Sequence, residues 1–110
     1  MGKFVITKRA NGEFQFNLKA TNGQVILTSE GYTTLAACKN GIESVKKNSQ
    51  EDARFERKEA KDGSPFFNLK ATNGQVIGKS EMYSSKSACE NGIESVKKNA
   101  PEAEVVEDFE

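Results

Sequence analysis

Two carboxylates, Glu30 and Glu81, are the side chains of this sequence best placed for acid–base chemistry. They occupy equivalent positions in the two halves of the chain, and each lies two residues before a tyrosine, Tyr32 or Tyr83. A carboxylate pair can act as general acid and general base if burial raises the pKa of one member. The simpler interpretation is a solvated glutamate beside a tyrosine that packs at the corner between a strand and a helix. Catalysis by this pair therefore predicts that Glu30 or Glu81 is buried.

Other catalytic and metal-binding arrangements lack the residues that they need. The 110 residues include no histidine, which removes serine–histidine and cysteine–histidine catalysis and the commonest metal ligand. Cys38 and Cys89 lie on the apolar stripes of two expected helices, where a cysteine behaves as a small buried apolar side chain. Two thiols without further ligands make a poor zinc site. We expect a protein that is not an enzyme and that uses no cofactor and no metal.

An internal repeat positions these residues. Residues 17–26 return letter for letter as residues 68–77, and residues 40–48 return as residues 91–99, in both cases 51 positions later. A lone half of this size would bury only about 60% of its unfolded surface, so two halves that share one core are expected. The expected division of this single domain, residues 1–110, is repeat one at 1–51, repeat two at 52–102, and a C-terminal strand with an acidic tail at 103–110.

Each repeat begins with the pattern of a three-stranded antiparallel sheet. In repeat one the alternation is clearest where Phe14, Phe16 and Leu18 share one face. Asn-Gly pairs between alternating segments predict hairpins with type I′ turns, which need positive φ at both central residues. The six expected strands are residues 3–9, 14–20 and 24–30, then 54–59, 66–71 and 75–81.

A helix follows the three strands in each repeat. The expected spans are residues 33–47 and 84–98. Thr33 or Thr34 is a suitable N-cap for the first helix, and Asn48 at its end tolerates the left-handed conformation of a C-cap. Gly41 interrupts the helix interior at a cost of about 1 kcal/mol against alanine, which indicates a close approach of the helix to the sheet.

The segment after the second helix stands where the first strand of repeat two stands after the first helix. Residues 104–107, Glu-Val-Val-Glu, lie 51 positions after residues 53–56. A further strand is expected there, and each repeat would then pass its last strand to the sheet of the other, which also protects an edge. The fold class that follows is α+β: two tandem β-β-β-α-(β) repeats form one antiparallel sheet with two helices packed on one face and exchanged C-terminal strands.

Charge is divided unevenly although the net charge is zero. All 16 Lys and Arg residues and 11 of the 16 acidic residues lie within residues 1–101, whereas residues 102–110 hold five acidic residues and no basic one. This tail either folds back on the basic body and screens it from polyanions, or extends into solvent. No signal-peptide pattern and no apolar run that approaches a membrane span is found, so a cytoplasmic location is expected.

These motifs resemble those of the YegP-like family of small, mostly bacterial proteins with a tandem duplicated module. Each half carries, in order, a Phe-rich strand, Asn-Gly-Gln followed by an apolar residue, Ser-Glu-x-Tyr, and a helix ending in Asn-Gly-Ile-Glu-Ser-Val-Lys-Lys-Asn. The resemblance covers nearly the whole chain and implies two β-β-β-α-β modules in a single sheet. The family is uncharacterised, so it assigns no functional residue. Repeat two departs from repeat one at Pro65 for Phe14, Gly78 for Leu27 and Lys86 for Leu35.

The face of the sheet opposite the helices is the candidate interaction surface. Its expected residues are Gln15, Asn17 and Lys19 in repeat one and Phe66, Asn68 and Lys70 in repeat two. A half-solvated antiparallel sheet ordinarily shows such residues even when it binds nothing. Where it does bind, a protein or peptide partner is favoured. The alternative is weak binding of single-stranded nucleic acid, by stacking on an exposed Phe66 and by phosphate contacts, which the zero net charge and the acidic tail disfavour.

The expected function is that of a small, non-enzymatic interaction or accessory module. We expect a monomer, because the duplication supplies within one chain what a single repeat would need a dimer to supply. No membrane partner is expected.

Overall fold

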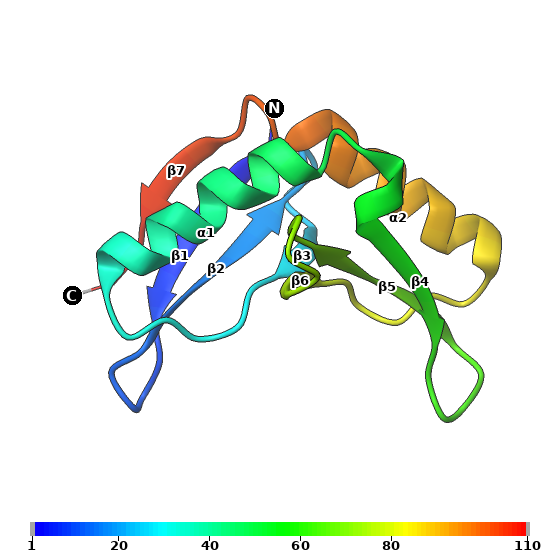
Figure 1. The fold of residues 1–110 in the computed structure, drawn as a ribbon, viewed down its shortest axis with the longest axis horizontal. Helices are drawn as coiled ribbons and strands as arrows, with labels where there is room; N and C mark the ends of the chain where they lie inside the picture. Colours follow the sequence, from blue (N-terminus) through cyan, green and yellow to red (C-terminus); the bar gives the residue numbers. More distant parts are fainter. Residues whose placement is uncertain (1, 110) are drawn as a thin grey trace.

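Seven strands form one sheet in the computed structural model, which describes residues 2–109. The strand order is β4-β5-β6-β3-β2-β1-β7, and the two helices cover one face (Figure 1). The strands are β1 (Lys3–Lys8), β2 (Phe14–Lys19), β3 (Val25–Thr28), β4 (Phe55–Glu59), β5 (Pro65–Lys70), β6 (Val76–Lys79) and β7 (Glu104–Glu107); the helices are α1 (Leu35–Asn48), α2 (Lys86–Asn99) and the short 3₁₀ helix η1 (Asp52–Arg54). The chain forms an arch, with the β1–β2 and β4–β5 hairpin loops at its two feet.

All strand pairs run antiparallel except β1 and β7, which are parallel. The sequence predicted an antiparallel sheet throughout, and the reason for the exception is a surplus strand. β1, β4 and β7 occupy equivalent positions in the repeat pattern, so the chain has three strands of this kind. Only two of them have an antiparallel partner of their own: β1 pairs with β2, and β4 pairs with β5. The end of α2 lies beside the start of β1, since a Cβ on Gly2 would lie 2.9 Å from Cβ of Asn99. The chain therefore enters β7 in the direction of β1.

The two repeats meet at the β3–β6 seam. Thr28 pairs with Lys79, its own equivalent in the other repeat, so the pseudo-twofold axis passes through this pair. On the helix side of the seam the repeats differ because only one of two equivalent positions has room for a large side chain. Leu27 is buried, and a Cβ on Gly78 would lie 2.6 Å from a Leu27 methyl carbon. Gly78 thus makes space for Leu27 at the axis.

The helices begin as the sequence predicted and end differently. Thr34 and Ser85 are the N-caps, and each accepts a hydrogen bond from the backbone N–H three residues later. The expected left-handed end at Asn48 is wrong, because no residue other than glycine has positive φ within residues 2–109. Instead the Asn48 side chain donates to the carbonyl oxygen of Ser44, at 2.9 Å, inside the helix. Neither helix of the described chain combines the length and the apolarity that a bilayer crossing requires.

The mid-helix glycines accommodate tyrosine side chains. A Cβ on Gly41 would collide with the hydroxyl oxygen of Tyr32, and a Cβ on Gly92 would collide with that of Tyr83. The predicted close approach is therefore real, although the nearest group is the tyrosine ring at the strand-to-helix corner, stacked on Phe16 in repeat one.

The hairpins close by a different turn from the one predicted. Only the glycine of each Asn-Gly or Asp-Gly pair has positive φ, for example +85° at Gly23, so the turns are not type I′. At the second hairpin Gly23 N–H donates to the Ala20 carbonyl oxygen, and Ala20 N–H donates to that of Gln24. This is a type I turn followed by a left-handed glycine. Asn22 keeps negative φ because its side-chain oxygen accepts from Gln24 N–H, at 3.0 Å.

The acidic tail folds back on the body. Glu107 of β7 forms an ion pair with Lys39 of α1 at 2.8 Å. Beyond the strand, the Phe109 ring packs edge-on against Phe14, with centroids 5.2 Å apart. Of the two alternatives for the tail, folding back on the body and extending into solvent, the first holds for residues 104–109.

Candidate functional site

The open face of the sheet is defined by the register of its strands. Leu18 and Leu27 are opposite each other and fully buried under the helices. Their strand neighbours Asn17 and Thr28 are also opposite each other, so they point to the face that no helix covers.

A bulge changes the pattern in both middle strands. Lys19 is opposite Val25, so Ile26 is an extra residue on β3, and it is buried. The same shift places Val76 opposite Lys70. Each bulge therefore turns a valine to the open face at a position where simple alternation places it on the helix side.

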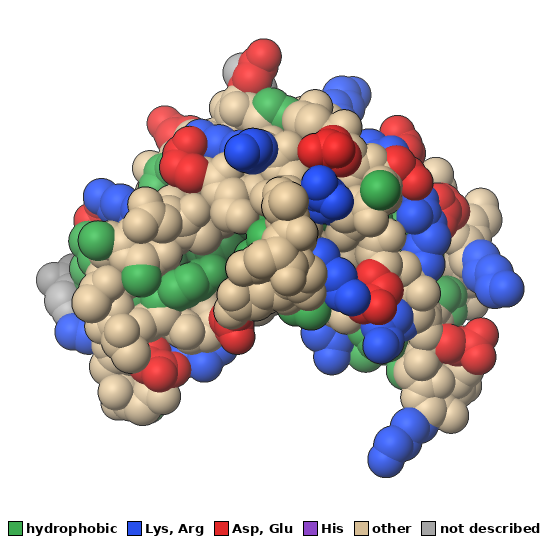
Figure 2. Space-filling model, viewed as in Figure 1, with side chains coloured by type: hydrophobic (Ala, Val, Ile, Leu, Met, Phe, Trp, Pro, Cys, Tyr) green, Lys and Arg blue, Asp and Glu red, His purple; other side chains and the backbone are tan. Residues whose placement is uncertain are grey.

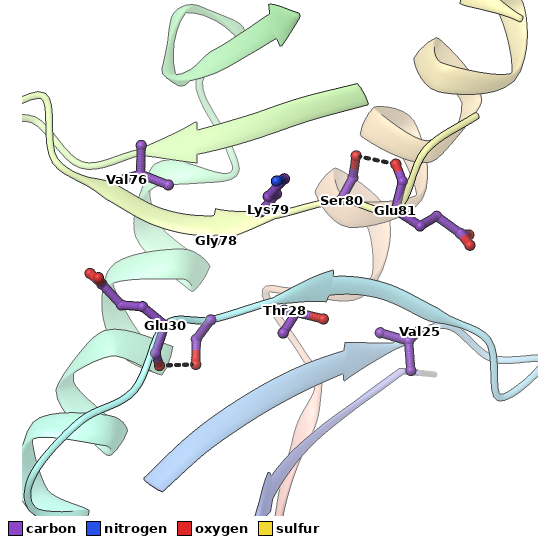
Figure 3. A pocket seen from close by; sticks show the side chains of 9 residues that line it. Val25, Thr28, Glu30, Val76, Gly78, Lys79, Ser80 and Glu81 are labelled. Carbon is purple, nitrogen blue, oxygen red and sulfur yellow. Dashed lines mark hydrogen bonds between the residues drawn. The ribbon is translucent and has the colours of Figure 1, made fainter. Parts of the chain in front are cut away.

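A groove of about 420 Å³ runs along the β3–β6 seam on this open face. Val25 and Thr28 of β3 line one side, and Val76 and Lys79 of β6 line the other (Figure 3). Val76 is one of the few large apolar side chains exposed in residues 2–109, at 37%. The groove is centred on the pseudo-twofold axis, so its two ends have similar chemistry.

Each end of the groove combines a valine with a glutamate from the other repeat. Glu81 lies near Val25 at one end, and Glu30 lies near Val76 at the other (Figure 3). Gln24 donates to the Glu81 carboxylate at 2.8 Å. Within residues 2–109 no hydrogen bond or ion pair engages the Glu30 carboxylate.

Two buried serines hold the strand ends that carry these glutamates. Ser29 accepts a hydrogen bond from Phe16 N–H at 2.9 Å and donates to the Glu30 carbonyl oxygen at 2.8 Å. Ser80 does the same with Phe67 and Glu81 in repeat two. These hydrogen bonds fix the backbone at both ends of the groove, while the side chains of Glu30 and Glu81 are exposed to solvent.

The glutamate pair does not meet the requirement for acid–base catalysis, because Glu30 and Glu81 are both exposed. The neighbouring tyrosines are poor bases at neutral pH, since burial, and secondarily the charge of Glu81, raises the pKa of Tyr83 to about 12. The pKa of Tyr32 is raised in the same way. The two glutamates and the two tyrosines therefore have the environment expected at a corner between a strand and a helix.

The two cysteines are buried and free, as the helical stripe predicted. Burial raises the pKa of the Cys38 thiol and, as the main cause, that of Cys89. A raised pKa keeps both thiols protonated and unreactive near pH 7.

The six residues of the predicted interaction surface lie on β2 and β5, which are not neighbours in the sheet. β3 and β6 separate them, so the groove lies between the two predicted groups. In repeat two, Asn68 and Lys70 both donate to Glu56, at 3.3 and 3.0 Å. In repeat one, Gln15 accepts from Arg9, and Asn17 and Lys19 are half-buried.

The prediction of an exposed aromatic ring at Phe66 is wrong. Phe66 belongs to the open face but is only 8% exposed. The Lys79 ammonium nitrogen lies 5.0 Å from the ring centroid and covers it by a cation–π contact. Stacking of a nucleic-acid base on this ring would first have to displace Lys79.

The groove residues were missed by reasoning from the sequence. Val25, Thr28, Val76 and Lys79 lie on short strands whose alternation is broken by the bulges. The available signal was the exact repeat of Gln-Val-Ile after Asn-Gly, which puts equivalent valines next to a twofold seam. Only the strand order shows that these two valines share one groove.

Surface charge does not form a field of one sign on the side shown in Figure 2. Lysine and arginine side chains are interspersed with aspartate and glutamate, and an apolar area lies in a hollow below α1. An interspersed surface favours specific contacts over general attraction to a polyanion.

Comparison with known proteins identifies the family of this chain. The profile of a family described as a domain of unknown function, DUF1508, matches residues 10–56 and again residues 60–107. The chain belongs to this family. Each match begins beyond the first strand of a repeat and ends in the copy of that strand that follows the helix, so the family unit ends in β4 or in β7.

Relatives match this chain across both of its repeats. The chain is 55% identical over 106 residues to a UPF0339 protein from the 5′ region of the ptx operon of Stutzerimonas stutzeri, covering 96% of both chains. A UPF0339 protein from Bordetella pertussis is 53% identical over 103 residues, covering 94% of this chain and 93% of the relative. The resemblance to YegP-like proteins is confirmed, and no function is established for these relatives.

Two solution structures have the same fold. A UPF0339 protein from Shewanella oneidensis superposes with a TM-score of 0.93 at 48% identity, covering 98% of this chain and 92% of that one. The YegP protein of E. coli, described as a protein of unknown function, also gives a TM-score of 0.93, at 44% identity over 98% and 93% of the two chains. The α+β repeat fold is thus shared by this chain and both of these relatives.

Proposed function

We propose that the protein is a non-enzymatic interaction module that binds an extended peptide segment of a protein partner in the groove along β3 and β6. The observation that carries the proposal is the groove itself, about 420 Å³ on the open face, with an apolar wall from both repeats. The exposure of Glu30 and Glu81 supports a binding role over an acid–base role.

The chemistry of the groove defines the segment. Val25 and Val76 provide contacts for apolar side chains, and a glutamate at each end favours Lys or Arg in the ligand. The central Lys79 weakens this preference little, because its ammonium group is directed over the Phe66 ring. The expected ligand is a short extended segment with apolar residues between basic ones.

Nucleic-acid binding is the weaker candidate. It depended on an exposed ring at Phe66 for base stacking, and this ring is covered. The two rim carboxylates would also repel phosphates that approach the groove.

A monomer is part of the proposal. β7 covers the outer edge of β1, and the free outer strand β4 carries the charged run Glu56–Glu59, which discourages pairing with a second sheet. Light scattering on a size-exclusion column would contradict the monomer if it gave a mass near twice 12.1 kDa.

A cytoplasmic location is also proposed, and the two free cysteines support it.

The test is selection of 12-residue peptides displayed on phage, followed by amide chemical-shift titration of the enriched peptide. Shifts are expected at Val25, Thr28, Val76 and Lys79. Val76→Asp should weaken binding about tenfold, since it removes the burial of one valine, worth about 1.5 kcal/mol. Val106→Asp is the matched control, because Val106 is half-buried on the open face outside the groove.

A mixed-sequence single-stranded oligonucleotide is the comparison ligand, at low salt and near physiological salt. Binding by phosphate contacts would fade steeply with salt, whereas an apolar peptide contact would not. Shifts on β2 and β5 with the oligonucleotide, and none in the groove with any enriched peptide, would overturn the proposal.

A further inference from the structure

Two lysines face each other on the open face of repeat one, away from the groove. Lys3 of β1 is directly opposite Lys19 of β2, and the neighbouring pair Phe4–Leu18 is buried on the helix side. Like charges at directly opposite positions of an antiparallel pair are destabilising. No carboxylate of the described chain lies within 4.0 Å of either ammonium group. Glu104 of β7 is opposite Lys3 on its other side, but no ion pair joins the two within residues 2–109. The two ammonium groups therefore lie close together without a carboxylate in direct contact.

Repeat two resolves the same problem with a carboxylate. Lys70, the equivalent of Lys19, forms an ion pair with Glu56 at 3.0 Å, and Asn68 also donates to Glu56. The hydrogen bonds from Lys70 and Asn68 lower the pKa of Glu56. Repeat one has Val5 at the position of Glu56. The duplicated framework therefore lacks in repeat one the negative group that it carries in repeat two.

A cavity of about 360 Å³ lies at the two lysines. Val5 and Val106 form an apolar part of its lining, and Val106 belongs to β7, which has no counterpart beside β4 within residues 2–109. Asp108 also lines the cavity, so Lys3, Lys19 and Asp108 together give it one net positive charge. A ligand that matches this cavity carries one negative charge and a short apolar chain.

We infer that this cavity is a binding site for a small organic carboxylate, held by Lys3 and Lys19 with its alkyl chain on Val5 and Val106. The ligand carboxylate takes the place that the Glu56 carboxylate takes in repeat two. This site is separate from the β3–β6 groove and does not depend on the proposed function. Both lysines are partly solvated, so the affinity is modest, with a dissociation constant on the order of 1 mM at low salt.

The probe is hexanoate, a six-carbon monocarboxylate, in an amide chemical-shift titration at about 20 mM ionic strength. Shifts are expected at Lys3, Val5, Lys19 and Val106, and they should weaken when salt is added. Val5→Glu places the carboxylate of repeat two in repeat one and should reduce hexanoate affinity at least tenfold. Lys19→Gln should have a similar effect and keeps the experiment informative if Val5→Glu lowers stability.

Lys58→Gln is the matched control, since Lys58 is an exposed open-face lysine on β4 outside the cavity. It should leave hexanoate binding unchanged. Saturable shifts with inorganic phosphate but not with hexanoate would overturn the carboxylate assignment. Hexanoate shifts of equal size in the parent protein and in Lys19→Gln would overturn the site, as would their absence at Lys3 and Lys19.

Discussion

The two outer edges of the sheet come from one duplicated pattern but are finished in opposite ways. In repeat one the edge strand β1 is covered by β7, and Phe109 packs against Phe14. In repeat two the edge strand β4 has no strand beside it within residues 2–109. The difference teaches that the C-terminal segment, although only a few residues long, determines which side chains each repeat needs.

Side chains at equivalent positions follow the presence or absence of this cover. Ile6, Phe14 and Leu35 of repeat one become Arg57, Pro65 and Lys86 in repeat two. A cavity of about 340 Å³ is lined by these three residues of repeat two. Large apolar residues at an uncovered edge would expose an adhesive surface, so two charged residues and a proline replace them.

The backbone shows the same difference. Phe14 and Tyr32 exchange two hydrogen bonds, each 2.7 Å long. In repeat two only one remains, from Tyr83 N–H to the Pro65 carbonyl oxygen, because proline has no N–H to donate. The corner of the uncovered repeat is therefore held by fewer bonds.

One helix position serves both edges with opposite charge. Lys39 of α1 binds Glu107 and so holds β7. Its equivalent on α2, Glu90, binds Arg57 at 2.6 Å and so holds β4 itself. Each helix fixes the strand at the outside of its own half of the sheet.

Removal of residues 104–110 should have the largest effect on this comparison. It strips β7 and Phe109 from the edge and exposes the side of Phe14 that they cover. We expect the free energy of unfolding to fall by about 3 kcal/mol, from lost apolar burial and one lost aromatic pair. Urea unfolding measures it, and Phe109→Ala should give roughly half of the loss. A truncated chain as stable as the parent would show that β7 is only a loosely attached strand.

Substitution of Gly78 by leucine should have the next largest effect. The new side chain would collide with Leu27 at the pseudo-twofold seam and lower the free energy of unfolding by about 2 kcal/mol. Leu27→Gly alone leaves a cavity and costs about 2–5 kcal/mol. The double exchange, Leu27→Gly with Gly78→Leu, moves one leucine across the axis and should recover most of both losses. Additive losses in this double-mutant cycle would mean that the two positions do not share one space.

The elements of the fold could be predicted because they depend on local patterns that the duplication shows twice. The strand alternation around Phe16, the N-cap at Thr34 and the buried helical stripe each follow from neighbours in the chain. The duplication also predicted that the strand after the second helix joins the sheet of repeat one, as β7 does beside β1. Its parallel direction was missed, because it depends on contacts with β1, about 100 residues away, and no local pattern encodes it. The turn type was missed because the Asn22 side chain bonds forward to Gln24, which keeps its φ negative.

The candidate site was predicted only in part. Alternation placed Asn17 and Asn68 on the open face correctly, since both lie in regular strands. It could not show that Lys79 covers Phe66, because that contact joins two strands through a flexible side chain. The groove itself depends on two bulges and on the strand order, which emerge only when both repeats are folded together.

Transfer of the repeat-one edge onto repeat two tests the comparison through association. The triple variant Arg57→Ile, Pro65→Phe and Lys86→Leu has the apolar edge without the strand that covers it. We expect a loss of about 1 kcal/mol from the broken Arg57 ion pairs, and self-association through β4. Light scattering and analytical ultracentrifugation measure the mass. Lys61→Ile, an exposed substitution in the nearby hairpin loop, is the control, and a monomeric triple variant would contradict the role given to the charged edge.

Neutralisation of Glu90 should have the smallest effect, and it should depend on pH. Hydrogen bonding to Arg57 lowers the pKa of Glu90 in the folded protein. A carboxylate whose folded-state pKa is lowered adds stability above its unfolded pKa, near 4.3, and loses it as the pH falls through the folded value. Glu90→Gln should therefore be less stable than the parent at pH 7, by a few tenths of a kcal/mol because the pair is half exposed, and equally stable below about pH 3.

Urea unfolding at pH 7, 5 and 3 measures this difference, and Glu43→Gln supplies the control. Glu43 is an exposed glutamate on the other helix, and its ion pair, 3.8 Å from Lys46, lies within α1 and does not involve β4. If Glu90→Gln and Glu43→Gln respond alike at all three pH values, then the Glu90–Arg57 pair does not hold β4, and the free edge would depend on strand pairing with β5 alone. If only Glu90→Gln shows the pH-dependent loss, the same helix position stabilises opposite edges through opposite charges, as the Lys39–Glu107 pair does in repeat one.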